Sequence, residues 1–299
     1  MLKHLGIERS RYYRWARRED EDRLRDKWPN PVHLNRALPE EVEAVVRYAL
    51  EHPRDGYRRL AWMMVDGDVV YLSPSSVYRI LKARYLLRRY KRSEAAKGIY
   101  DFKPTRPHLQ WHTDIMYLRV NLNWYFFVGV LDAYSRYIVH WELLTSMTAE
   151  EVTLVVQAAV DRHPGVRPRI VHDRGSQFIS REWRDFVREA GLEDIRTALA
   201  HPESNGKLER FHRSLRQGID EEHLRSLTHA RSVVDAWVLY YNTERLHSAL
   251  RYLRPLDYLE RDPAALLAER DRKLAAARTR RQEINTARLT EGHRNGTNG

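Results

Sequence analysis

The sequence contains no cysteine among its 299 residues. This absence excludes disulfide bonds, zinc sites built from cysteine and thiol nucleophiles, and it suits a reducing compartment. The chain also lacks an apolar run long enough to cross a bilayer, and residues 1–15 lack the apolar segment of a secretory signal. We therefore expect a cytoplasmic protein with no membrane partner.

Basic residues are concentrated in the two flanks of the chain. The net charge is +11 in total, with +8 in residues 1–100, −1 in residues 101–260 and +4 in residues 261–299. A near-neutral centre between basic flanks favours contact of the flanks with a polyanion, of which nucleic acid is the most common. A basic solvated surface without any partner is an alternative that charge alone leaves open.

Residues 1–100 are predicted to be helical. Apolar residues recur at helical spacing in residues 42–49 and 60–64, and Ser73 followed by Pro74 is typical of a helix start. Three short basic helices fit a helix-turn-helix unit that binds DNA, although an ordinary helical bundle fits the same pattern. The candidate DNA-contacting residues in this region are Arg58, Arg59, Arg79 and Lys82.

Residues 101–107 are predicted to be a linker, and residues 108–260 change to an α/β pattern. Residues 110–144 contain three strand candidates, the first two joined by a hairpin turn at residues 121–123. Short strands then alternate with helices, the first of which has Thr148 and Glu151 in capping-box positions. Three adjacent strands followed by β-α units predict a mixed sheet with helices on its faces.

The remaining residues, 261–299, are predicted to form a basic, solvated helical tail with a disordered end. Aromatic residues of the predicted strands are assigned to the hydrophobic core, namely Trp111, Trp124, Tyr125, Phe126 and Phe127. Four residues are assigned a structural role, in which they lock the segment after the helix that contains Glu209 to the core, namely Tyr240, Tyr241, Arg245 and His247.

Three acidic residues differ from the others by their context. Asp114 lies inside an apolar strand, Asp173 ends another such strand, and Glu209 follows the loop signal Asn205-Gly206. An acid in a buried strand is costly unless it is paired or binds a cation, and carboxylate oxygens are the donors that Mg²⁺ and Mn²⁺ prefer. On this argument alone, a metal site and a set of salt-bridged structural acids are equally supported.

Residues 108–260 resemble the catalytic core of the retroviral integrase superfamily, and in particular the orfB-type insertion-sequence transposases of bacteria. The motifs that carry this resemblance follow one another in order: WHTDIMYL, VLDAYSRYIVHW, HDRGSQF, SNGKLERFHRSLR and YYNTERLHSALRYLRP. The 35 residues between Asp173 and Glu209 are the spacing typical of the superfamily. Upstream, LGIERSRYYRW, DGYRRLAWMM and SPSSVYRILKARYLL resemble the helix-turn-helix modules of these transposases.

The resemblance implies a ribonuclease H-like fold with a mixed five-stranded sheet. It implies a DDE transposase that cuts and joins DNA at insertion-sequence ends, with Asp114, Asp173 and Glu209 as catalytic residues and as ligands of two Mg²⁺ ions, for which Mn²⁺ can substitute. It also implies double-stranded DNA as partner, a homo-oligomer assembled on DNA, and a bacterial, nucleoid-associated protein. Because four residues precede LGIERSRYYRW, a helix-turn-helix protein or fusion from an upstream reading frame is a further expected partner.

Several other residues are candidates for DNA contact near the acids. Arg213 and Arg216 lie four and seven residues after Glu209, which places them on the same helix face, where an arginine paired with Glu209 is the alternative. Weaker candidates are Lys207, Asn205 and Gln177. His112 and His172 each flank a catalytic acid and are predicted to be buried supporting residues rather than metal ligands.

Two rival functions remain at this point. A DNA-binding protein without catalysis would bind metal but leave DNA uncut, although all three acids are intact. A ribonuclease H-like nuclease that acts on RNA hybrids or junctions would not need the upstream helix-turn-helix region, and a panel of substrates would distinguish it from a transposase.

Overall fold

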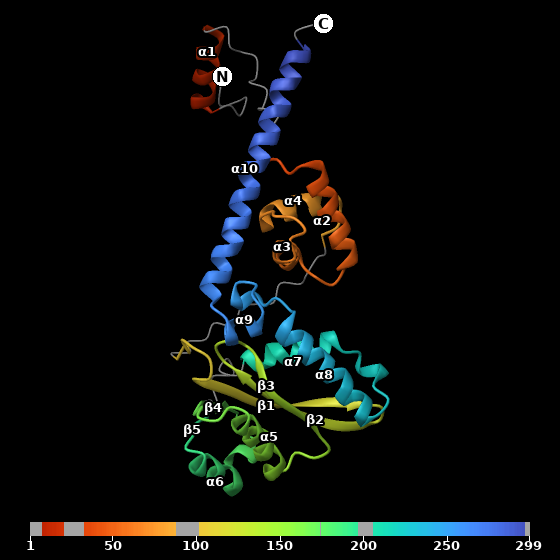
Figure 1. Ribbon diagram of the computed structural model, residues 1–299, viewed down its shortest axis with the longest axis vertical. Helices are drawn as coiled ribbons and strands as arrows, with labels where there is room; N and C mark the ends of the chain where they lie inside the picture. Colours follow the sequence, from red (N-terminus) through yellow and green to blue (C-terminus); the bar gives the residue numbers. More distant parts are fainter. Residues whose placement is uncertain (1–7, 21–32, 88–101, 174, 197–205, 297–299) are drawn as a thin grey trace.

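The computed structural model describes residues 8–20, 33–87, 102–173, 175–196 and 206–296 (Figure 1). Its α-helices and strands in chain order are α1 (Arg9–Asp20), α2 (Pro39–Glu51), α3 (Tyr57–Asp66), α4 (Pro74–Ala83), β1 (Gln110–Val120), β2 (Asn123–Asp132), β3 (Ile138–Leu144), α5 (Ala149–Asp161), β4 (Arg169–His172), α6 (Arg181–Glu189), β5 (Glu193–Arg196), α7 (Gly206–Gly218), α8 (Leu227–Thr243), α9 (Pro255–Glu260) and α10 (Pro263–Gly296). Short 3-10 turns are η2 (Ser176–Ile179), η4 (Glu221–His223) and η5 (Ser248–Leu250). Among the described segments, none of the helices combines the length and apolarity that crossing a membrane requires.

The five strands form one mixed sheet in the order β3-β2-β1-β4-β5. β1, β2 and β3 pair antiparallel in sequence, whereas β4 joins β1 and β5 joins β4 in parallel. β1 therefore lies in the centre of the sheet. This is the ribonuclease H-like arrangement that the sequence predicted, and the helices between the later strands make the parallel connections.

Helices cover both faces of the sheet (Figure 1). On one face α7 and α8 pack against the strands in a cluster that contains Leu118, Phe127, Phe211 and Tyr241. On the other face α5 and α6 form a second cluster around Trp111. The alternation of side chains along β1 and β2 supplies both clusters, because successive residues of a strand point to opposite faces.

Local sequence signals account for several element boundaries. The Thr148 hydroxyl accepts the Glu151 N–H and the Glu151 carboxylate accepts the Thr148 N–H, which confirms the capping box of α5. Ser73 caps α4 through the N–H of Ser76. Val120 pairs with Asn123 across a two-residue turn, in which Asn121 adopts a φ of 55°. These predictions from sequence are confirmed.

Helix α10 is the main difference from the sequence prediction. A helix was expected here, but it is not solvated on all sides, and it continues to Gly296 where a disordered end was expected. It runs beside the helical bundle of α2, α3 and α4 (Figure 1). Arg270, Arg281 and Asn285 are buried in this contact. Polar side chains of α10 thus form its contact with the helical bundle. The spacing of apolar residues in the sequence does not predict a contact of this kind.

The Arg270 side chain shows how this contact is made. Its guanidinium donates to both carboxylate oxygens of Asp66, at 2.7 and 2.6 Å, and to the carbonyls of Arg251 and Tyr252. It also lies over the Trp62 ring, 4.8 Å from the centroid. Arg270 therefore joins α10, the end of α3 and the segment that precedes α9.

The aromatic residues assigned to the core behave as predicted with one clear exception. Trp111 and Phe127 are fully buried and Tyr125 packs against the core, but Trp124 is 56% exposed, so its assignment was wrong. Trp124 pairs with Arg119 beside the hairpin turn, on the face of the β1-β2 ribbon opposite the buried Leu118 and Val120. Tyr241 is buried between Phe211 and Trp237, in agreement with its predicted structural role.

Candidate active site

The parallel pairing of β1 with β4 places Asp114 and Asp173 at the same level of the sheet. His112 of β1 pairs with Val171 of β4, and each acid lies two residues further along its own strand direction. Parallel strands run out at the same edge of a sheet, so the two carboxylates emerge together there. Asp114 still lies within β1, whereas Asp173 is exposed directly after the end of β4.

The carboxylate of Asp114 is held in an environment that disfavours its charge. Its side chain is 20% exposed, and one oxygen accepts the N–H of Ile115 at 2.9 Å. Burial, together with the negative charges of Asp173 and Glu209, raises the pKa of Asp114 to about 7 against the opposing effect of the Ile115 N–H. The three acids singled out from the sequence are therefore electrostatic neighbours.

A tight loop orients Asp173. Its Oδ1 accepts the N–H of Gly175 at 2.9 Å. A Cβ atom at position 175 would lie 3.0 Å from Asp173 Oδ1 and 3.0 Å from Gln177 Oε1, so glycine permits this close approach.

The buried His172 supports Asp173 from behind. It is fully buried; its Nδ1 contacts the backbone carbonyl of Asp173, and its Nε2 lies 2.5 Å from Asp194 Oδ1 on β5. The Trp183 indole donates to the same Asp194 oxygen at 3.1 Å. Burial opposes the ionisation of Asp194, but the hydrogen bond and charge of His172 hold its pKa below the ordinary value. The predicted supporting role of His172 fits this geometry.

Sequence reasoning missed Asp194 and Trp183 in this network. Both lie in segments that were assigned as an ordinary strand and an amphipathic helix, and nothing in their local pattern marks them. The signal is tertiary, because the parallel register of β4 and β5 places His172 beside Arg196 and brings the Asp194 side chain within reach of the imidazole.

Glu209 is presented by α7, whose buried residues Leu208, Phe211 and Leu215 fix the helix on the sheet. The next turn of the helix carries His212, whose Nδ1 lies 3.9 Å from Asp114 Oδ2. Burial lowers the pKa of His212 to about 4, with a further contribution from Arg216. Within the part of the chain that the structure describes, His212 Nε2 has no hydrogen-bond partner.

A hollow of about 560 Å³ lies between α7 and the middle of β1. Glu209, Arg213 and Arg216 all line it, as their helical spacing predicted. Arg216 donates to the Tyr117 carbonyl at 2.9 Å and lies 3.6 Å from Glu221, so it does not pair with Glu209. Arg213 is exposed at the mouth of the hollow. An acidic group thus adjoins a cationic groove.

The other candidates for DNA contact are placed differently. The Lys207 ammonium lies near Arg136 and Asp132; burial, together with the Arg136 charge, lowers its pKa to about 8 against the opposing effect of Asp132. The Gln177 amide donates to the Met147 carbonyl at 3.0 Å. Asn205 lies outside the described residues. None of these three therefore gains support from the geometry as a DNA contact.

In the helical region the four basic candidates divide into two groups. Arg58, Arg79 and Lys82 are exposed and remain open to a ligand. Arg59 is engaged within the chain, because its guanidinium lies 2.7 Å from Asp55 Oδ1 and donates to the Leu246 carbonyl at 3.1 Å. Arg59 thus ties the helical region to the segment after α8.

The oxygen atoms of Asp114, Asp173 and Glu209 are the candidate ligands for a divalent metal ion. As the side chains stand, no group of three His, Cys, Asp or Glu residues within 8–20, 33–87, 102–173, 175–196 and 206–296 could hold a metal ion. Nevertheless, the negative charges of Asp173 and Glu209 disfavour ionisation of Asp114, and no described Lys or Arg forms an ion pair with any of the three acids. Oxygen donors with uncompensated negative charge fit a hard divalent cation.

The sequence matches the Integrase core domain family over residues 104–202 and over residues 190–255. It is 28% identical over 184 residues to the transposase for insertion sequence element IS904 of Lactococcus lactis, covering 59% of this chain and 73% of that protein. It is 32% identical over 158 residues to the transposase InsF for insertion sequence IS3A of Escherichia coli K12, covering 52% and 55%.

Among solved structures, the HTLV-2 integrase catalytic core domain in complex with magnesium covers 52% of this chain and 99% of its own, with a TM-score of 0.44 and 14% identity. The two matches to the Integrase core domain together span the whole sheet and its acids, and the two relatives named above are transposases. The chain belongs to the insertion-sequence transposases of the retroviral integrase superfamily.

Proposed function

We propose that this transposase cuts and joins DNA strands at insertion-sequence ends in a reaction that depends on divalent metal, with Asp114, Asp173 and Glu209 as the metal-binding and catalytic residues. The observation that carries the proposal is the position of the partly buried Asp114 carboxylate on β1, whose pKa is raised in part by the charges of Asp173 at the end of β4 and Glu209 on α7. Two Mg²⁺ ions, or Mn²⁺ in their place, would supply Lewis-acid activation of the attacking and leaving oxygens.

The residues of the chain have separable tasks in this proposal. Asp114 is fixed in the rigid centre of the sheet, Asp173 is oriented by the Gly175 N–H, and Glu209 completes the group from a helix. Neutral His212 fills the space behind Asp114 without adding charge. Such fixed positioning of a constellation on rigid elements lowers the entropic cost of reaching the transition state.

The cationic groove beside the acids holds the substrate. Arg213 and Arg216 would contact phosphates that flank the scissile bond, which fixes the register of the duplex without reading its sequence. In the first step a water oxygen attacks phosphorus and the 3′ oxygen leaves as a hydroxyl. In the second, that 3′ hydroxyl attacks a phosphodiester of the target and releases a new 3′ end. The first step breaks one P–O3′ bond, forms one P–O bond to the water oxygen and leaves a 5′ phosphomonoester; the second step exchanges one phosphodiester for another.

Two DNA ends must be joined in one event, so assembly of more than one copy on DNA belongs to the same proposal. A site of action on the bacterial chromosome, in the nucleoid, follows from the substrate.

The experiment compares strand cleavage and joining on a labelled duplex that bears the terminal sequence of the element, with Mg²⁺, with Mn²⁺ and with chelator. Asp114→Asn, Asp173→Asn and Glu209→Gln should each lower the rate by at least about 10³-fold, because several kcal/mol of charge stabilisation are lost. Glu222→Gln, at an exposed acid outside the group, is the matched control. Near-normal activity in any of the three variants would refute the assignment.

A further inference from the structure

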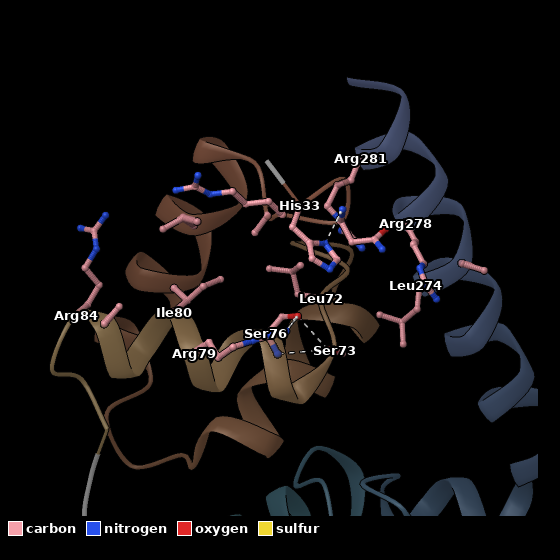
Figure 2. A pocket seen from close by; sticks show the side chains of 16 residues that line it. His33, Leu72, Ser73, Ser76, Arg79, Ile80, Arg84, Leu274, Arg278 and Arg281 are labelled. Atoms are coloured by element: carbon pink, nitrogen blue, oxygen red, sulfur yellow. Dashed lines mark hydrogen bonds between the residues drawn. The ribbon is translucent and has the colours of Figure 1, made fainter. Parts of the chain in front are cut away.

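A basic groove lies between α4 and α10, far along the chain from the acids (Figure 2). Its volume is about 880 Å³. Five arginines line it, and among the lining residues that the structure describes there is no aspartate or glutamate. The arginines are Arg36, Arg79, Arg84, Arg278 and Arg281. The groove therefore offers concentrated positive charge to a ligand.

The walls of this groove are held in place by contacts within the chain. Arg281 donates to Glu41 Oε1 at 2.8 Å and to the Tyr71 carbonyl at 3.0 Å, which anchors α10 against the bundle. Arg278, one turn earlier on α10, is exposed and forms no ion pair with any described residue. Leu72 and Leu274 form part of an apolar floor (Figure 2). The site is preorganised, with a free cation at its rim.

Further hollows have lining residues in common with this groove and with the hollow beside Glu209. Arg84 also lines a hollow beside α2, which in turn shares Leu50 with a hollow between the bundle and α7. That last hollow shares Gln217 with the hollow beside Glu209. The segment beside α2 carries Glu43 and Glu51 along with its arginines, so it acts as a neutral spacer between two cationic ends.

We propose that one DNA duplex runs across these neighbouring hollows, and that α10 contributes phosphate contacts at the far end of this path through Arg278. The proposal rests on the proposed function and extends it to a surface built by the C-terminal helix. A DNA backbone alternates charged phosphates with apolar deoxyribose, which matches arginines at a rim above an apolar floor.

Duplex DNA fits these observations better than an acidic peptide does. An acidic peptide needs a single cationic groove, whereas here the cationic surface recurs at Arg213 and Arg216 beside the acids and again between α4 and α10. A long, stiff polyanion can engage both ends at once, and binding at one end raises the effective concentration at the other.

The first test measures binding of a labelled duplex of mixed sequence as a function of salt. Loss of one phosphate contact lowers the salt slope by about 0.9, which corresponds to about 15-fold weaker binding at 50 mM salt and about 4-fold at 200 mM. We expect this for Arg278→Ala on a duplex of about 30 bp, three helical turns, but not on one of about 10 bp, a single turn held at the active site. Arg280→Ala, on the same helix and exposed but outside the groove, is the control.

The second test uses the absence of cysteine from the chain. Ala275→Cys places a unique thiol in the groove, and Ala276→Cys places one at the next exposed position of α10, outside it. Saturating long duplex should slow maleimide labelling of the Ala275→Cys variant at least about 5-fold and leave the Ala276→Cys variant unchanged, since a bound backbone covers the groove. Thermal unfolding verifies that both variants are folded.

The possible outcomes separate this proposal from the proposed function. Equal salt slopes for Arg278→Ala and Arg280→Ala, or equal loss on short and long duplexes, would overturn the path even if strand joining is intact. Protection of the Ala275→Cys thiol by poly-glutamate but not by duplex would overturn it in favour of an acidic peptide. If strand joining is absent while the length-dependent effect of Arg278→Ala is present, the DNA path stands and the proposed function fails.

Discussion

The attachment of α10 to the helical bundle depends on Arg270, and replacement of this residue is the most informative test of the fold. The Arg270 side chain is 3% exposed, and its guanidinium donates four hydrogen bonds, two to Asp66 and two to backbone carbonyls. Arg270→Ala removes both charge and packing and leaves the Arg251 and Tyr252 carbonyls without their donor. Breaking a buried pair of this kind typically costs about 3–5 kcal/mol.

The exposure of Asp66 reduces the loss of stability that we expect for Arg270→Ala. Asp66 is 38% exposed, so water can solvate the carboxylate once the arginine is gone, and we expect the loss to lie near 3 kcal/mol. Arg270→Lys should recover little, because an ammonium cannot reproduce the bidentate contact or reach all four acceptors. The control is Arg272→Ala, which breaks the surface pair with Glu269 and should cost less than about 1 kcal/mol.

Calorimetry and urea titration of the full chain measure the effect. In the Arg270→Ala variant we expect the helical bundle to unfold at a lower temperature than the sheet domain, as a separate transition, because α10 no longer couples them. If Arg270→Ala and Arg272→Ala differ by less than about 0.5 kcal/mol, which is the usual range for surface substitutions, the contact of α10 with the bundle does not hold the protein together.

Three further predictions concern packing, protonation and the support of Asp173. Gly218→Ala would place a Cβ 1.7 Å from Trp237 Nε1 and should cost at least about 1–3 kcal/mol in a chemical denaturation experiment. Gly206→Ala, whose Cβ would meet no atom of the described residues within 4 Å, should be neutral, and equal effects of the two variants would contradict the close packing of α7 and α8. Burial raises the pKa of Asp132 to about 6, so the folded protein holds a proton that the unfolded chain releases. Stability should therefore fall as the pH rises from about 4 to about 6, and Asp132→Asn should flatten this part of the curve; an unchanged slope would refute it. Asp194→Ala should lower the rate of strand joining about 10–100-fold at unchanged DNA affinity, because it frees the imidazole behind Asp173, whereas the surface variant Asp185→Ala should not; a matching loss of DNA affinity would indicate a wider structural defect.

Much of the sheet domain was predictable because its signals are local. The capping box at Thr148, the hairpin turn at Asn121 and the apolar strand around Asp114 each depend on residues a few positions apart. The spacing of Arg213 and Arg216 after Glu209 likewise fixes their common helix face. In these cases backbone geometry converts sequence distance directly into spatial position.

The features that escaped prediction depend on residues far apart in the chain. Asp66 and Arg270 are 204 positions apart, and neither residue differs from an ordinary surface residue by its neighbours. Trp124 has the local composition of a core strand and is exposed because it lies on the face of the β1-β2 ribbon opposite the cluster formed with α7 and α8. Arg59 was expected to meet DNA and instead contacts Asp55 and the Leu246 carbonyl. A cation on a helix does not itself distinguish a ligand contact from an intramolecular one.

The distribution of charge acquires a physical reason once the structure is considered. The sheet domain carries a near-neutral sequence, yet within it the charges of Asp173 and Glu209 act on Asp114, while Arg213 and Arg216 line a hollow with Glu209. Repulsion between neighbouring carboxylates favours the binding of a divalent cation, which would relieve it. The two arginines attract the phosphates of the DNA, and so bring the polyanion to the proposed metal site. The excess positive charge then lies where the path continues, on α4 and α10. Because contacts with phosphate make affinity fall with salt, a chain with this division should release DNA from the far groove first as ionic strength rises, while the substrate at the acids is held longest.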